Sequence, residues 1–447
     1  MMKFIHFFSL ILMLFSLYCS NRINEKIQMI NVQTNKDSLS AELTPVLDQE
    51  FSLWYPLCID SAYGGFYSDL DYEWKLDGQQ NKMIVTQARH IWSAANGSMF
   101  YKNRDDLIKI AEHGYKFLSD KMWDKQYGGF YDLVSREGKP FEENGGIIKR
   151  AYGNAFAIYG LAAFYKASGN KDALKLAQET FQWMEKNSYD PEYGGYFQFM
   201  NREGKPFKEG YHGTPPKDQN SSIHILEAFT ELYSVWPDSL LKERLNSILH
   251  IVRDIITSKK GYMVLFFDQD WTPSGKGEYE FDHVSFGHDV ETAYLMLEAS
   301  EALGIKNDSA TLRIAKTMVD HALNNGWDGE NGGIFDGGYY YENKNKAEII
   351  RDTKEWWSQA EALNSFLLMS QLFPHDKLMY YEKFCIQWNY IKTFLLDHNY
   401  GGWYWGGLDK QENHKYGPKS TIWKCNYHTS RSLINCIKGL SKVQENM

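Results

Sequence analysis

Apolar side chains recur along most of the chain with the 3.6-residue spacing of a helix that buries one face. These stretches come in pairs, and a short segment rich in glycine and aromatic residues separates each pair from the next. With one stretch added at the front and one at the back, the pattern predicts twelve helices in six hairpins. Clear examples are residues 38–55, 151–165, 172–184, 223–232, 240–256 and 425–440.

The segments between the helix pairs carry one repeated tag, in which two glycines are followed by aromatic residues. Successive copies begin 64 to 71 residues apart, which defines a repeat. Two copies continue into SREGKPF and NREGKPF, which are typical of a β-hairpin that turns at Glu-Gly. The copies begin at Gly64, Gly128, Gly194, Gly261, Gly332 and Gly401, and the copy at Gly261 is degenerate.

Six stacked helical hairpins with a constant turn can close into a ring, with inner helices lining the centre and outer helices covering them. We therefore predict an all-α fold, an (α/α)6 barrel, with short β-hairpin loops at one face. Residues 38–445 would form a single domain. The open alternative is a superhelical solenoid built from the same hairpins.

The N-terminus has the pattern of an export signal. An apolar run follows Lys3 within residues 1–18, and it is too short to favour a membrane span. Cys19 follows directly, where a bacterial lipoprotein carries its acylated cysteine. We predict an exported protein, periplasmic or lipid-anchored to the outer membrane, with residues 19–37 as a linker. Membrane attachment would depend on a lipid at Cys19 alone, and we expect a monomer or weak homodimer.

The charge and composition of the chain limit the classes of ligand that it is expected to bind. The formal net charge is -9, and no basic cluster is longer than a dipeptide, which argues against nucleic acid. The chain contains no G-x-G-x-x-G or Walker-type loop, so we predict no nucleotide cofactor. Aromatic residues make up 16% of the chain, which favours either an aromatic core or an aromatic binding cleft.

The residues that are hardest to explain as packing lie in the first turns of the predicted inner helices. Six helix starts would bring them together at one mouth of the barrel, where a pocket with convergent polar groups is the default site hypothesis. These candidates are Arg89, Tyr152, Asn154, Asn220, His224, His288, Glu291, Trp356, Trp357, His428 and Arg431.

Two of these helices carry His-x-x-Glu, a spacing that puts imidazole and carboxylate on one face so that the carboxylate can orient the ring. No H-E-x-x-H or third paired ligand accompanies them, so we predict no metal. Histidines without a metal suit proton transfer beside a carbonyl. Near His428, Trp423 suits stacking on a sugar ring and Arg431 could steady an oxyanion. A glycosidase would instead use a carboxylate pair, such as Glu291 and Glu361.

Four segments resemble the cellobiose 2-epimerase branch of the N-acylglucosamine 2-epimerase superfamily, whose members include enzymes acting on mannobiose. They are KDQNSSIHILEAFTELY from residue 217, FGHDVETAYL from 286, KEWWSQAEAL from 354 and WKCNYHTSR from 423. The resemblance covers essentially everything after the predicted signal. It implies cofactor-independent epimerisation at C2 of the reducing-end sugar of β-1,4-linked disaccharides, through a cis-enediolate.

The resemblance also implies roles for individual residues. His288 and His428 would be the acid/base pair, with Glu291 supporting His288. His224 and Asn220 would bind the reacting sugar, and Arg89 would stabilise the enediolate. Trp423 and either Trp356 or Trp357 would stack on the disaccharide, and Tyr152 and Asn154 would line the site. An exported location is also consistent with a role in mannan degradation.

Three alternatives to the epimerase remain. An aldose-ketose isomerase would use the same enediolate but return the proton to C1. A glycoside hydrolase or lyase on the same barrel would release monosaccharides. A non-catalytic glycan-binding lipoprotein would hold the sugar and leave it unchanged.

Overall fold

The computed structural model describes residues 36–142, 146–342 and 344–445. The predicted export signal, Cys19 and the linker up to residue 35 lie outside these residues. Within them, no helix combines the length and the apolar character that crossing a membrane requires.

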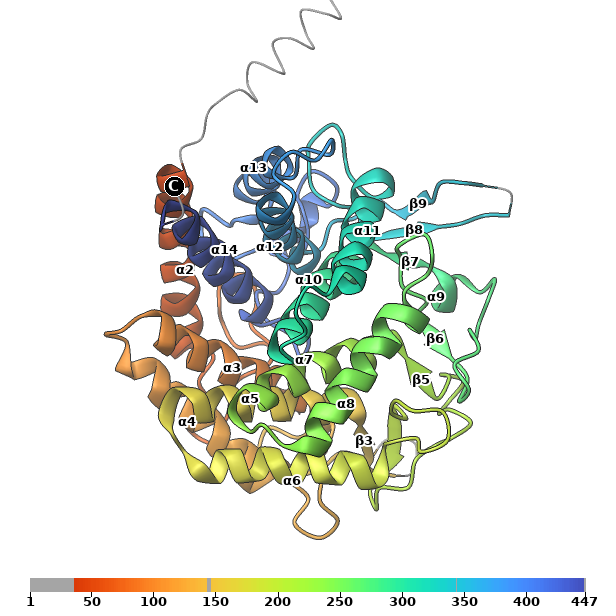
Figure 1. The fold of residues 1–447 in the computed structure, drawn as a ribbon. Coiled ribbons are helices and arrows are strands. Elements are labelled where there is room, and N and C mark those ends of the chain that lie inside the picture. Colours follow the sequence, from red (N-terminus) through yellow and green to blue (C-terminus); the bar gives the residue numbers. More distant parts are fainter. Residues whose placement is uncertain (1–35, 143–145, 343, 446–447) are drawn as a thin grey trace, which may run out of the picture.

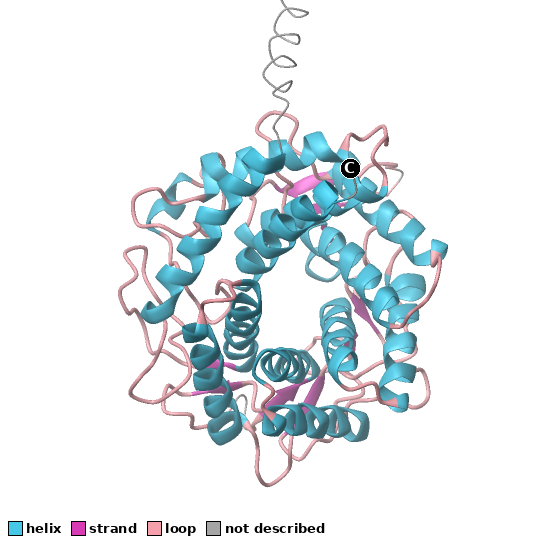
Figure 2. Cartoon of the chain, turned by 60° about the vertical axis from the view of Figure 1, so that its left-hand side comes forward, coloured by secondary structure: helices cyan, strands magenta, loops and turns pink. Residues whose placement is uncertain are grey.

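Twelve long helices form two concentric layers in the described part of the chain (Figures 1 and 2). The inner helices are α3 (Ile84–Phe100), α5 (Ala151–Ser168), α7 (Gln219–Val235), α10 (Phe286–Ala302), α12 (Trp356–Leu372) and α14 (Tyr427–Glu445). The outer helices are α2 (Lys36–Leu57), α4 (Asp105–Phe117), α6 (Lys171–Asn187), α8 (Ser239–His250), α11 (Ser309–Asn325) and α13 (Tyr380–Tyr390).

The inner helices form a closed ring. Each packs against the next in the order α3, α5, α7, α10, α12 and α14, and α14 returns to pack against α3. Figure 2 looks toward this ring, with the outer helices around it. The prediction of an (α/α)6 barrel is therefore confirmed and the open solenoid is excluded. The helices predicted at residues 151–165 and 425–440 begin within two residues of the observed starts of α5 and α14, and α7 begins four residues before the predicted range 223–232.

The inner and outer helices differ in how their apolar residues are distributed. Helix α5 is apolar on all sides, and from Gly153 to Phe164 every residue is buried, because outer helices and neighbouring inner helices surround it. The outer helix α6 is amphipathic, and it buries Leu176, Phe181 and Met184 while its lysines stay near solvent. Asn170 caps that helix by accepting hydrogen bonds from the first-turn backbone at 3.0 Å.

The strands lie at one end of the barrel and join neighbouring repeats. The antiparallel pairs are β1 (Lys82–Met83) with β2 (Leu133–Val134), β3 (Ile148–Arg150) with β4 (Phe199–Asn201) and β5 (Lys217–Asp218) with β6 (Phe266–Phe267). A three-stranded sheet contains β7 (Val284–Ser285), β8 (Gly337–Tyr339) and β9 (Glu348–Arg351). The REGKPF hairpins are confirmed, since Gly138 and Gly204 close tight turns with positive φ. The remaining short elements are α9 (Tyr279–Asp282) and four turns at Leu118–Met122, Ile251–Ile256, Ile391–Leu395 and Glu412–Tyr416.

A buried ion pair lies under five of the six tags in the described residues. In four pairs a lysine two residues before the inner helix, and in the fifth Lys419 eight residues before α14, bonds the aspartate that precedes the two glycines, at 2.5 to 3.0 Å, and both side chains are almost fully buried. In four of these pairs the lysine also donates to the carbonyl of the first glycine. The pairs are Lys82–Asp60, Lys149–Asp124, Lys217–Asp190, Lys354–Asp328 and Lys419–Asp397. The degenerate tag at Gly261 has neither partner, which explains its poor match to the repeat.

The tag glycines are required by space as well as by backbone conformation. Gly65 has a φ of +66°, and a Cβ added there would lie 2.5 Å from Oε1 of Gln87 and 2.8 Å from the ring of Phe117. The tag therefore lies directly against an inner helix and an outer helix, and a side chain at this position would separate them.

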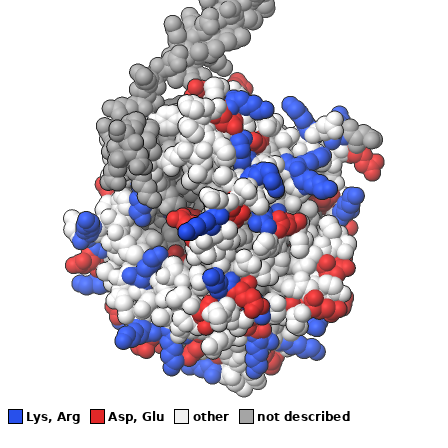
Figure 3. Space-filling model, viewed as in Figure 1, with Lys and Arg blue, Asp and Glu red and all other residues white. Residues whose placement is uncertain are grey.

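Acidic and basic side chains are interspersed on the face of the molecule shown in Figure 3. This mixture matches the modest net charge of the sequence.

We expect Lys217→Met to destabilise the barrel by about 3–5 kcal/mol, because it leaves Asp190 buried without its cation. Chemical denaturation would measure the change. Lys415→Met, which removes an exposed pair with Glu412, is the control and should cost less than about 1 kcal/mol. Equal losses for the two variants would contradict a structural role for the buried pairs.

Candidate active site

Most of the predicted site residues converge at one end of the ring, and eight residues of the site share two helix positions, whereas His288 is the third residue of α10 and Arg431 the fifth of α14. The second and sixth residues of an inner helix lie one turn apart on the same face, which turns toward the barrel centre. The fourth residue faces the tag. The second position is occupied by Tyr152, Asn220, Trp357 and His428 in four of the helices. The sixth position is occupied by Arg89, His224, Glu291 and Glu361 in four of them.

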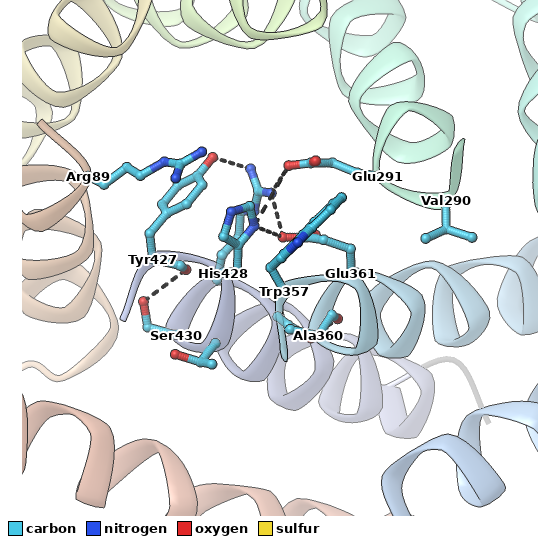
Figure 4. Close-up of polar contacts among 12 residues, drawn as sticks. Arg89, Val290, Glu291, Trp357, Ala360, Glu361, Tyr427, His428 and Ser430 are labelled. Carbon is cyan, nitrogen blue, oxygen red and sulfur yellow. Dashed lines mark hydrogen bonds and ion pairs between the residues drawn. The ribbon is translucent and has the colours of Figure 1, made fainter. Parts of the chain in front are cut away.

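Arg431 lies at the centre of a buried charge network, to which Glu291, Glu361 and His428 in Figure 4 belong. Its guanidinium bonds carboxylates from three other inner helices: Glu227 of α7, Glu291 of α10 and Glu361 of α12. It also donates to the hydroxyl of Tyr427, which in turn donates to Glu227. Both terminal nitrogens of Arg431 are used in holding four helices together, whereas its Nε has no hydrogen-bond partner among the described residues. These contacts favour a structural role, and the substrate contact predicted for Arg431 stays a prediction.

His428 is oriented by this network. Its Nδ1 lies 2.6 Å from Glu361, whose oxygens also accept hydrogen bonds from Arg431 and from Tyr294. If Glu361 carried a proton on either oxygen, that proton would point at the hydrogen that Arg431 or Tyr294 donates to the same oxygen. The hydrogen between Glu361 and His428 is therefore carried by Nδ1 of His428. The tautomer is thereby set, and Nε2 keeps its lone pair.

His224 is held in the same way, at Nδ1. Glu227 lies 2.8 Å from that nitrogen, which confirms the contact expected from the first His-x-x-Glu. Burial opposes ionisation of Glu227, but Arg431 and His224 outweigh it and lower the pKa of this carboxyl to about 2. Glu227 is therefore an anion across the neutral pH range.

The second His-x-x-Glu behaves differently. His288 bonds Ser285 through Nδ1 at 2.7 Å, whereas Glu291 turns away toward Arg431 and lies 3.9 Å from Nδ1 of His428. The expectation that Glu291 supports His288 is thus corrected. The cation at Arg431 attracts the carboxylate more strongly than a neutral ring does, so spacing alone gave the wrong partner.

The two adjacent tryptophans have different roles. The Trp357 ring contacts both acid/base candidates, with centroids 4.6 Å from His288 and 5.7 Å from His428. Trp356 is buried and packs on Trp405 at 4.5 Å, so it belongs to the core and not to the site. Trp423 lies in the loop before α14 and is 44% exposed, which leaves its ring open to a ligand.

Arg89 differs from Arg431 because no carboxylate forms an ion pair with it among the described residues. It donates to the hydroxyl of Tyr152 at 3.1 Å and to the carbonyl of Trp423 at 3.4 Å. Nε of Arg89 and Oδ1 of Asn220 are buried without a hydrogen-bond partner in the described part of the chain. Unpaired buried groups of this kind are costly unless a ligand satisfies them.

Asn154 does not line the site. It is fully buried, and its amide accepts from the backbone of Phe130 at 2.9 Å and donates to the carbonyl of Arg150 at 2.8 Å. It occupies the fourth position of its helix, where Gln87 and Gln359 bind the backbones of other tags in the same way. The substrate role predicted for Asn154 is therefore corrected to a structural one.

Burial sets the protonation of the acid/base candidates. Desolvation, reinforced by His224, His283 and other neighbouring positive groups, lowers the pKa of His288 to about 3. Burial and then Arg89 lower the pKa of His428 well below its ordinary value. Both rings are therefore neutral at physiological pH.

Glu291, Glu361 and His428 lie close enough together to resemble a metal site, with ligand atoms within 4.8 Å of one another. The guanidinium of Arg431 already bonds both carboxylates. A second cation at this point would meet direct repulsion from it.

Sequence reasoning did not assign site roles to Glu227, Ser285, Tyr294 and Tyr427. The His-x-x-Glu spacing did indicate that Glu227 lies beside His224. Tyr294 and Tyr427 act through partners on other helices, and these partners have no fixed spacing in the sequence.

A model of the N-acylglucosamine 2-epimerase (GlcNAc 2-epimerase) family matches residues 65–432, most of the chain. The chain belongs to the N-acylglucosamine 2-epimerase family.

Several relatives of this family member are cellobiose 2-epimerases. It is 33% identical over 389 residues to the cellobiose 2-epimerase of Ruminococcus albus, covering 85% of this chain and 93% of the relative. It is 28% identical over 412 residues to that of Bacteroides fragilis, covering 90% and 98%. The structure of cellobiose 2-epimerase from Spirochaeta thermophila superposes with a TM-score of 0.80 at 27% identity, covering 93% and 99%. These matches place the chain among carbohydrate 2-epimerases, isomerases of the cellobiose 2-epimerase type.

We expect Asn154→Ala to lower the free energy of unfolding of this epimerase by about 1–3 kcal/mol, because it leaves the backbone N–H of Phe130 buried and unbonded. Chemical denaturation would measure the change. Asn220→Ala is the matched variant and should lower activity while changing stability by less than about 0.5 kcal/mol. If Asn154→Ala kept full stability but lost activity, its structural assignment would be wrong.

Proposed function

We propose that the protein interconverts glucose and mannose at C2 of the reducing-end sugar of β-1,4-linked disaccharides such as cellobiose and mannobiose. The observation that carries this proposal is the pair of neutral histidines, His288 and His428, that both contact the Trp357 ring. The Nδ1 atom of each ring is engaged by a neighbour, which leaves Nε2 as the reactive nitrogen. The substrate class is that named for the relatives.

The reaction would proceed from the open-chain sugar. One histidine takes the C2 proton at Nε2, and the electron pair of that C–H bond becomes the C1–C2 double bond while the C1 carbonyl oxygen gains negative charge. Rotation about C2–C3 presents the other face of the enediolate to the second histidine. That histidine, after taking a proton from solvent, returns it to C2, the carbonyl reforms, and the first histidine releases the C2 proton to solvent. No outside oxidant or reductant is needed.

Arg89 would stabilise the enediolate oxygen, because it is a buried cation without a carboxylate partner in the described residues. Asn220 and His224 would bind the reacting sugar through its neighbouring oxygens. Trp357 and Trp423 would stack on the two rings of the disaccharide, one inside the site and one at its rim. This assignment omits Trp356 and Arg431 from direct contact.

The hydrolase alternative is disfavoured by the same contacts. Its acid/base pair would be Glu291 and Glu361, and Arg431 bonds both carboxylates. Both carboxylates are therefore held in the ion network around one guanidinium. The isomerase alternative shares the enediolate and differs only in whether C1 or C2 receives the proton.

The proposal is tested by incubating the protein with cellobiose, and separately with mannobiose, in D2O and following C2 by NMR. We expect deuterium at C2 together with the epimeric disaccharide. His288→Ala and His428→Ala should each lower the rate by at least about a hundredfold. His250→Ala, an exposed histidine on an outer helix, is the control. A ketose product would support the isomerase, released monosaccharide the hydrolase, and binding without exchange the glycan-binding protein.

The pH profile gives a second expectation. A histidine whose pKa is lowered stays neutral until the pH falls to that lower value, so the base form persists in mild acid. We expect kcat/KM to change by less than about twofold between pH 8 and pH 5. Activity regained at pH 7 after incubation at pH 5 would control for unfolding. A loss centred near pH 6.5 would instead indicate a histidine with an ordinary pKa.

A further inference from the structure

The indole ring of Trp357 is held at two ends by residues that the proposed chemistry does not use. Its Nε1 donates to a carboxylate oxygen of Glu355 at 2.8 Å. At the other end, the ring edge lies where a side chain at position 287 would be, because a Cβ added to Gly287 would be 2.8 Å from Cη2 of Trp357. A ring fixed at both ends cannot rotate about its side-chain bonds without losing one of these contacts.

The side chain of Glu355 bonds the indole instead of capping the helix that it precedes. It is the N-cap residue of α12, yet its side chain forms no cap hydrogen bond with the first turn. At the same point of α7, Asp218 does cap its helix by accepting from the backbone of Ser221. The carboxylate of Glu355 is therefore directed to the indole at the expense of the helix end.

A second carboxyl fixes Glu355 in turn. Asp336 accepts the backbone N–H of Glu355 at 2.8 Å and the hydroxyl of Thr353 at 2.5 Å. Burial and then the charge of Glu355 raise the pKa of Asp336 to about 7. Crowding two acids beside one tryptophan is unfavourable unless the arrangement has a use.

We propose that Glu355 is a positioning residue that sets the plane of Trp357 beside His288 and His428, with Asp336 and Gly287 as its supports. The inference rests on the proposed function, because it assigns Trp357 to the surface on which the open-chain sugar rotates about C2–C3 within reach of the two histidines. A ring held in one plane keeps C2 within reach of both histidines before and after rotation about C2–C3. A mobile ring would leave the second proton transfer misaligned.

The neighbouring tryptophan shows that the contact is specific. Trp356 directly precedes Trp357 in the chain and is buried in the core. Its Nε1 has no hydrogen-bond partner among the described residues. The indole that receives a charged acceptor is the one beside the histidines.

The test compares Glu355→Gln with Glu355→Ala in the full protein. Glutamine keeps an acceptor oxygen for the indole N–H, so we expect kcat within about twofold of wild type, whereas alanine should lower kcat roughly tenfold. Asp336→Asn, which keeps the acceptor for the backbone of Glu355, should resemble Glu355→Gln. Glu412→Ala, on an exposed turn, is the control and should leave kcat unchanged.

A second measurement does not depend on activity. In protein labelled with 15N at tryptophan, the indole N–H signal of Trp357, assigned with Trp357→Phe, should move in Glu355→Ala and stay near its wild-type position in Glu355→Gln. An unmoved signal in Glu355→Ala, or a glutamine variant as slow as the alanine variant, would overturn the positioning role. If wild-type protein exchanged no C2 proton, the proposed function would fail, while the indole signal would still report whether Glu355 holds the ring.

Discussion

The rest of the site depends on one buried cation. Three glutamates from α7, α10 and α12 meet inside the barrel, and without a partner each would cost several kcal/mol to bury. The guanidinium of Arg431, from α14, satisfies them together. Two of these carboxylates, Glu227 and Glu361, then bind Nδ1 of His224 and His428. A structural ion network thus determines which ring nitrogen is left for chemistry.

Within each inner helix, one position contacts the tag and other positions face the barrel centre. The fourth residue, such as Gln87, Asn154 or Gln359, binds the backbone of a tag and keeps the repeat in place. The second and sixth residues face the centre and are free to differ between repeats, because no tag constrains them. Buried lysine and aspartate pairs anchor the same frame from outside the ring. A nearly symmetric scaffold can therefore present an asymmetric set of groups.

The two arginines near the site illustrate how environment assigns function. Both are buried and both approach the ring of Tyr427. Arg431 is matched by carboxylates and is structural, whereas Arg89 has only neutral partners in the described residues and keeps its charge available. The same reasoning separates Trp357, whose ring lies beside two histidines, from Trp356, whose ring lies in the core.

The sequence alone determined the architecture, because helical periodicity and a recurrent tag are local patterns that survive without any knowledge of long-range contacts. It also placed His224, His288 and His428 at helix starts, and it identified the contact of His224 with Glu227, which lies within a single turn. Only the tertiary structure decided the partners of Arg431, the direction of Glu291, the internal role of Asn154 and the choice between the two tryptophans. Each of these depends on which charged or packed group approaches from another helix, and ring closure brings together residues with no fixed separation along the chain.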